Sequence, residues 1–160
     1  MPTRNDHIAE KPETWQRRAV MAVLARAPAD EIARGLGEVP LDIDFTELRP
    51  PETGLVMLRG RIGGDGAAFN VGEATVTRAA VQLRSGEKGF AYVLGRDARK
   101  AQLAALCDAL WQTKANRGAI EESVLAPLKR AQEEMRARKA AETAATRVDF
   151  FTLVRGEDER

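Results

Sequence analysis

The N-terminal part of the chain carries residues at helical spacing, and a proline marks where the pattern stops. Residues 12–27 are expected to form a helix, because a proline suits its first turn and Pro28 ends it. The helical period is indicated by residues that recur every three or four positions, namely Trp15, Ala19, Ala22, Val23 and Arg26. Residues 30–36 predict a second short helix, closed by Gly35 or Gly37. The two helices are expected to form a small cap over a sheet.

The middle of the chain alternates apolar and polar residues, as half-buried strands do. Strands are therefore expected at residues 41–46, 55–62, 69–84 and 90–94. The segment Arg49-Pro50-Pro51 is expected to stop the first strand, and Thr53-Gly54 to turn the chain. Gly72 indicates a bulge or bend, and residues 85–89 a five-residue hairpin loop. The pattern predicts an antiparallel meander of about four strands.

Two helices and a last apolar segment complete the chain. Asp97 is the expected N-cap of a helix with one apolar stripe, which runs to about residue 114 and ends at Asn116-Arg117-Gly118. Residues 120–143 predict the second helix, which Pro127 must kink or divide. Its distal half is charged on nearly every side, so we expect it to project or to pack on a partner.

The last predicted strand, residues 148–154 (VDFFTLV), contains two adjacent phenylalanines that must be covered. We expect it either to pair with the chain's own sheet, which we favour, or to add to the sheet edge of another subunit. The fold class predicted for the whole chain is α+β. It consists of an antiparallel sheet, made of the meander and a C-terminal strand, packed with N-terminal and C-terminal helices.

Composition and charge fit a single domain over residues 1–160, with flexible tails at residues 1–11 and 155–160. The net charge is +1, from 25 basic and 24 acidic residues. This balance argues against a general nucleic-acid binder, which needs a surplus of basic residues. Neither a signal peptide nor an apolar run of about 20 residues is present. We therefore expect a cytoplasmic protein without a membrane partner.

The glycine-rich stretch of residues 60–78 is the strongest candidate for a functional site. A glycine loop between strands is either a tight hairpin, which we favour, or a cradle that lets the backbone approach a phosphate. Arg59, Arg61 and Arg78 flank the loop and are able to bind phosphate or carboxylate. Glu73 is expected to be a partly buried partner of one of these arginines. The candidates for partner or phosphate contact are Arg59, Arg61, Gly63, Gly64, Gly66, Glu73, Arg78, Arg147, Phe150, Phe151 and Arg155.

Catalytic constellations are mostly missing from the sequence. The single histidine, His7, lies in the N-terminal tail, so neither a histidine triad nor a histidine-rich metal site is expected. Cys107, the single cysteine, lies on an apolar helical stripe and is interpreted as a small core residue. We expect no catalytic residue, metal or cofactor on this chain alone.

Long blocks of the sequence resemble the PhnG subunit family of the bacterial carbon–phosphorus lyase machinery. They are residues 49–83, RPPETGLVMLRGRIGGDGAAFNVGEATVTRAAVQL, residues 91–97, AYVLGRD, and residues 145–157, ATRVDFFTLVRGE. Residues 15–27, WQRRAVMAVLARA, are similar too, so the resemblance spans most of the chain.

The resemblance implies a subunit of a cytoplasmic core complex that contains two copies each of this chain and of the PhnH, PhnI and PhnJ subunits. It implies that MgATP is a substrate of the complex, whose adenine is replaced by a phosphonate to give ribose 1-phosphonate 5-triphosphate. It also places an iron–sulfur cluster and S-adenosylmethionine on another subunit. This chain is then an accessory subunit, and the alternative is a stand-alone nucleotide- or phosphate-binding enzyme that uses the glycine loop and its arginines.

Overall fold

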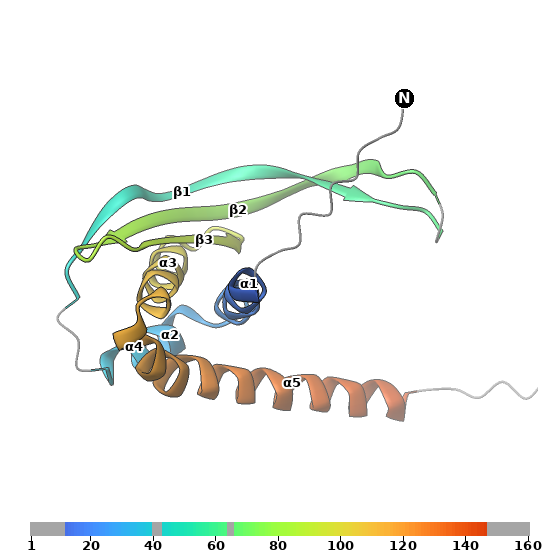
Figure 1. The fold of residues 1–160 in the computed structure, drawn as a ribbon. Helices are drawn as coiled ribbons and strands as arrows, with labels where there is room; N and C mark the ends of the chain where they lie inside the picture. Colours follow the sequence, from blue (N-terminus) through green and yellow to red (C-terminus); the bar gives the residue numbers. More distant parts are fainter. Residues whose placement is uncertain (1–11, 40–42, 64–65, 147–160) are drawn as a thin grey trace, which may run out of the picture. The chain divides into compact units, whose positions relative to one another are not determined.

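The computed structural model describes residues 12–39, 43–63 and 66–146. The chain divides into two units, Met1–Lys129 and Arg130–Arg160, which are described separately. The first unit holds a three-stranded antiparallel sheet with helices, so the predicted α+β class is confirmed. Figure 1 shows α3 (Ala98–Gln112) and α1 (Pro12–Leu24) on one side of this sheet, with α2 (Ala29–Gly37) and α4 (Lys114–Ile120) beyond α3.

Helices α1 and α2 form where the proline pattern predicts them, and α1 ends at Leu24, ahead of Pro28. Val20 and Leu24 of α1 are buried, whereas Trp15, one of the recurring residues, is 61% exposed. The buried residues and the recurring ones both repeat at helical spacing, and burial of the aliphatic side chains removes apolar surface from water. Helix α2 ends at Gly37, one of the two predicted terminators, whereas Gly35 is buried within the helix, where a Cβ would lie 2.5 Å from the carbonyl oxygen of Ser123.

The first strand is longer than predicted, because β1 runs without a break over Phe45–Gly60. The prolines do not stop it and Gly54 does not turn the chain, so two predicted strands are one. The strand order β1-β2-β3 leaves β1 at an edge, where a proline costs no ladder hydrogen bond. A shift of register between Arg49 and Glu52 absorbs the two prolines as a bulge, and a second shift, between Glu47 and Arg49, lies just before them.

The other strands, β2 (Phe69–Leu83) and β3 (Lys88–Leu94), agree closely with the prediction. Leu58 pairs with Gly72 and Arg59 with Asn70, so the expected irregularity at Gly72 is present. Strand β3 begins one residue before Gly89, which pairs with Val81. Gly89 is needed there because an added Cβ would lie 1.9 Å from the carbonyl oxygen of Ala105 in α3.

Helix α3 is the centre of the core, and its contacts with Gly89 bring it unusually close to the sheet. Asp97 caps its first turn by accepting a hydrogen bond from the Lys100 amide at 2.8 Å, as predicted. Along β3, alternate residues are buried and exposed, so the sheet has one face toward the helices and one outer face. The largest fully buried aliphatic side chains are Leu24, Ile32, Val81, Val93, Ile120, Val124 and Leu125.

The chain continues as a helix beyond α3 where the sequence predicted a stop. Helix α3 ends at Gln112, and the Thr113 side chain caps α4 by accepting from the Asn116 amide. Asn116-Arg117-Gly118 therefore lies inside α4. The π-helical turn η1 (Glu121–Leu125) then leads into α5 (Ala126–Ala145) just before Pro127, which confirms the predicted division of the helix there.

The second unit contains the remainder of α5. From residue 130 to residue 145 no described residue of this helix is buried, and Met135 is 64% exposed. Isolated helices of this length are marginal in water, so this stretch needs a covering surface. None of the described helices is long and apolar enough to cross a membrane.

Candidate interaction surface

The glycine loop joins β1 to β2 as a hairpin, since Gly60 pairs directly with Phe69. Gly63 has a φ angle of 68°, which L side chains rarely adopt. A Cβ at Gly66 would lie 2.3 Å from the carbonyl oxygen of Ile62. These two glycines are therefore explained by the turn itself, whereas Gly64 lies outside the described residues.

The candidate arginines do not gather around this loop. Arg59 pairs with Asn70 at the end of the hairpin and Arg61 lies exposed in the loop. Arg78 is nine residues past the start of β2, about 30 Å along the strand. Glu73 is exposed rather than partly buried, because it lies in a part of β2 that no helix covers. The structure therefore supports no phosphate cradle built from these residues.

Past the end of β3, β1 and β2 continue as a two-stranded ribbon, which we call the hairpin arm (residues 54–60 and 69–75). It carries five large apolar side chains that are between 42% and 61% exposed, namely Leu55, Met57, Leu58, Phe69 and Val71. A two-stranded ribbon is marginally stable by itself, and contiguous exposed apolar surface marks an interaction site. The arm is the clearest uncovered surface among the described residues.

Both faces of the hairpin arm are apolar. Leu55 and Met57 share the face of β1 that carries Thr53, which pairs with the buried Thr77. Leu58 lies on the opposite face, opposite Gly72, which has no side chain to cover it. A partner must therefore contact the arm from both sides to remove these side chains from water.

Arg78 takes part in a different arrangement, on the outer face of the sheet. Its Nε donates to Glu52 Oε1 at 2.6 Å, and Arg49 Nη1 donates to the same oxygen at 2.7 Å. The pKa of Glu52 is lowered, mainly by the hydrogen bond from Arg78. The pKa of Arg78 is raised, first by a hydrogen bond with the Tyr92 side chain and then by the bond to Glu52. We call Arg49, Glu52 and Arg78 the arginine–glutamate cluster.

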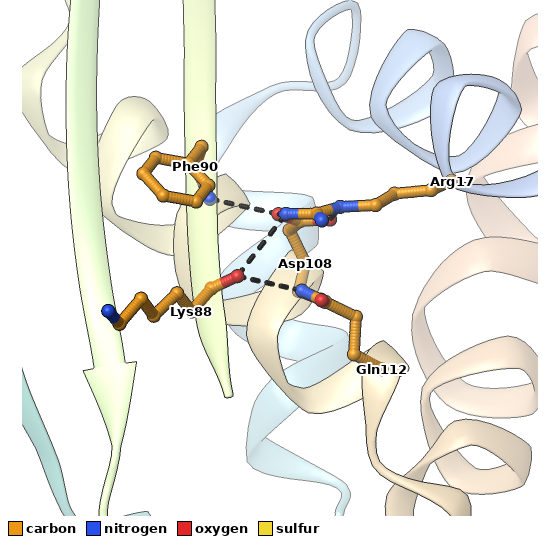
Figure 2. A network of polar contacts seen from close by, with 5 residues as sticks. All are labelled: Arg17, Lys88, Phe90, Asp108 and Gln112. Atoms are coloured by element: carbon orange, nitrogen blue, oxygen red, sulfur yellow. Dashed lines mark hydrogen bonds and ion pairs between the residues drawn. The ribbon is translucent and has the colours of Figure 1, made fainter. Parts of the chain in front are cut away.

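A buried polar network that the sequence did not reveal joins α1, β3 and α3 (Figure 2). The Asp108 carboxylate accepts two hydrogen bonds from Arg17, at 2.8 and 2.6 Å, and one from the Phe90 amide at 2.8 Å. Arg17 and Gln112 both donate to the Lys88 carbonyl, at 3.2 and 2.8 Å. These bonds satisfy the Lys88 carbonyl and the Phe90 amide, which no neighbouring strand pairs at the edge of β3. The network therefore has a structural role. The sequence signal for this network is Asp108, a charged residue within the apolar stripe of α3.

The other buried groups are also structural. The Thr77 hydroxyl donates to the Gly95 carbonyl at 2.7 Å and accepts from the Asp97 amide at 3.1 Å, which fixes the turn from β3 into α3. Burial raises the pKa of Cys107 to about 12, so its thiol stays protonated, as expected of a core residue. In the described ranges no group of three or more histidine, cysteine, aspartate or glutamate residues is placed to hold a metal ion.

Four candidates, Arg147, Phe150, Phe151 and Arg155, lie outside the described residues, as does the predicted strand at residues 148–154. Among the residues that sequence reasoning proposed and the structure describes, only Arg59 and Arg61 lie beside the glycines. The exposed apolar side chains of the hairpin arm are not among the predicted site residues, because alternation along a strand predicts that one face is buried.

Two comparisons with known proteins agree. Residues 15–156 match the family described as "Phosphonate metabolism protein PhnG". The chain is also 51% identical over 143 residues to the "Alpha-D-ribose 1-methylphosphonate 5-triphosphate synthase subunit PhnG" of Rhizobium meliloti (strain 1021), an alignment that covers 89% of this chain and 91% of the relative. The chain therefore belongs to the PhnG family of phosphonate metabolism proteins.

Proposed function

We propose that this chain is the PhnG-type subunit of an alpha-D-ribose 1-methylphosphonate 5-triphosphate synthase, and that it is an accessory subunit without a complete active site of its own. The identity to the Rhizobium meliloti subunit, along nearly the full length of both chains, supports the proposal.

The proposal extends to the rest of the complex. The partners are subunits of the PhnH, PhnI and PhnJ kinds, with two copies of each subunit in a cytoplasmic assembly. MgATP is the substrate of the complex, and a phosphonate replaces its adenine. The iron–sulfur cluster and S-adenosylmethionine belong to another subunit. The stand-alone alternative is not favoured, because Arg78 lies far from Arg59 and Arg61 along β2.

The observation that carries the proposal is the hairpin arm. Its apolar side chains are exposed on both faces, although its strands are in regular register. We propose that the arm inserts into a cleft of another subunit of the complex, which contacts both faces of the arm. Arg59 and Arg61, near the end of the arm, fit acidic residues at the rim of such a cleft.

The test is co-purification with the other three subunits. Leu55 and Met57 are 61% and 53% exposed, so burial of each by a partner contributes about 1–2 kcal/mol to binding. The double variant Leu55→Ser/Met57→Ser is therefore expected to lose at least about 30-fold in affinity for the rest of the complex. Because both side chains are exposed, the free energy of unfolding of the isolated chain should change little.

Trp15→Ser is the matched control, since Trp15 is as exposed as Leu55 but lies on α1. This variant should enter the complex like the unaltered chain. If the unaltered chain itself fails to co-purify with the other subunits, the proposed function is wrong. If it co-purifies and the double variant does so equally well, the hairpin arm is not the docking surface.

A further inference from the structure

The outer face of the sheet carries a second surface, distinct from the hairpin arm, built around the arginine–glutamate cluster. Residues three apart on a regular strand point to opposite faces, yet Arg49 and Glu52 share one. They do so because Arg49 pairs with Ala80 and Glu52 with Arg78, which leaves one extra residue on β1 at Pro50-Pro51. The proline bulge thus brings the Arg49 and Arg78 guanidinium groups to one carboxylate oxygen, and bulges often re-aim side chains in this way near functional sites.

An aromatic row borders the cluster. Phe90 and Tyr92 project from the same face of β3 and are 48% and 55% exposed. Phe90 pairs with Ala80 and Tyr92 with Arg78, so a small side chain stands between the aromatic rings and Arg49. A pocket of about 240 Å³ results, lined by Arg49, Arg78, Ala79, Ala80, Phe90 and Tyr92.

Charge and polarity together specify what fits this pocket. Two guanidinium groups share one carboxylate, so the cluster carries an excess of one positive charge. Aromatic side chains, such as the two next to the cluster, are enriched at interface cores. The apolar row continues along β3 to Leu94, which is 71% exposed. An occupant with a carboxylate beside an apolar side chain would complement both parts.

We propose that the outer face of the sheet binds a segment of another subunit that places an aspartate or glutamate between Arg49 and Arg78 and an apolar side chain against Phe90 and Tyr92. This inference rests on the proposed function, because it takes the partner from the same complex. A protein partner is favoured over a free anion since the apolar row continues past the pocket, and exposed arginines bind small anions weakly in water.

Competition for the complex provides the test. Tagged unaltered chain and an untagged variant are co-expressed with the other three subunits, and the share of each in the purified complex is measured. Arg49→Glu and Tyr92→Ser should each be under-represented by at least about tenfold. Arg84→Glu is the matched control. Arg84, at the β2–β3 turn, is also an exposed arginine in an ion pair, which it forms with Asp44. This variant should compete normally.

The outcomes separate this inference from the proposed function. Normal incorporation of Arg49→Glu and Tyr92→Ser, in a complex that retains the unaltered chain, overturns the outer-face proposal alone. Two further measurements on the isolated chain would also overturn it. One is self-association that Arg49→Glu abolishes, which would assign the face to a second copy. The other is saturable binding of inorganic phosphate that Arg49→Glu abolishes, which would assign it to a small anion. Equal unfolding midpoints of variant and unaltered chain confirm that the fold is intact.

Discussion

Asp108 carries a charge in the core, where its side chain is only 2% exposed. Its cost of burial is offset by three hydrogen bonds, two from the Arg17 guanidinium and one from the Phe90 amide. The Arg17 side chain remains 35% exposed, so the pair is partly solvated at one end. The ion pair also selects which face of α1 turns inward, and the apolar spacing of that helix alone could not decide this.

Asp108→Asn should therefore destabilise the chain by about 2–3 kcal/mol, because Arg17 loses its counter-charge and an amide cannot accept all three bonds. The free energy of unfolding in urea measures this effect. Arg84→Gln, which removes an exposed ion pair, is the control and should cost less than about 1 kcal/mol. Equal losses for the two variants would show that the network stabilises the fold no more than an exposed ion pair does.

The buried thiol of Cys107 should make the free energy of unfolding depend on pH. Burial, with a smaller effect of Asp108, raises its pKa from an ordinary value of 9.0 to about 12 in the folded chain. The folded state therefore keeps the proton that the unfolded state releases, so stability is lost as pH rises from 9 towards 12.

Between pH 8 and about pH 10, the unaltered chain should lose about 1.4 kcal/mol more stability than Cys107→Ala. The comparison of the two chains removes the contribution of other groups that titrate in this range. Urea unfolding at both pH values gives the difference. Parallel pH profiles for the two chains would contradict the buried, protonated thiol.

At the scale of elements, Gly89 determines how closely α3 packs on the sheet. Gly89→Ala should cost about 3 kcal/mol, since the new methyl group meets backbone atoms of Ala105 and Ala109 that cannot move independently. Gly54→Ala on β1 is the control, because nothing lies within 4 Å of its added Cβ. Thermal or urea unfolding distinguishes the two variants, and a neutral Gly89→Ala would mean that the helix and strand separate easily.

Most elements could be predicted from the sequence, because helix caps and alternation are local signals. Asp97, for example, caps its helix as predicted, and α1 ends at Leu24, ahead of Pro28. The prolines of β1 do not stop the strand as predicted, because whether a strand lies at a sheet edge depends on its neighbours. Similarly, Thr113 rather than Gly118 ends a helix, since the Trp111 carbonyl and ring bind Arg117 and keep it within α4.

The candidate site was less predictable than the fold. The glycines correctly indicated a hairpin, but which side chains it leaves exposed depends on where β3 and α3 end relative to β2. The arginine–glutamate cluster depends on a bulge that shifts the register by one residue, and no single-sequence pattern shows such a shift. Burial of Asp108 likewise required the position of Arg17, 91 residues away in the sequence.

At the scale of the whole molecule, two surfaces of the described residues expose several large apolar side chains, the hairpin arm and the aromatic row. The exposed stretch of α5, which is mostly charged, has no buried residue either. The proposed role as a synthase subunit would account for these surfaces, because large exposed apolar patches mark interaction sites. Under that proposal, the chain is a folded core that presents these surfaces to neighbouring subunits.

Hydrogen exchange of the hairpin arm, compared between the isolated chain and the assembled complex, is the sharpest test of the arm as a docking surface. Backbone amides of residues 54–60 and 69–75 should exchange at least about tenfold more slowly in the complex, because the partner covers both faces of the ribbon. Amides of Val81 and Val93, buried in the core already, serve as the internal reference. Equal exchange of the arm in both states, with the chain present in the complex, would show that no partner covers it.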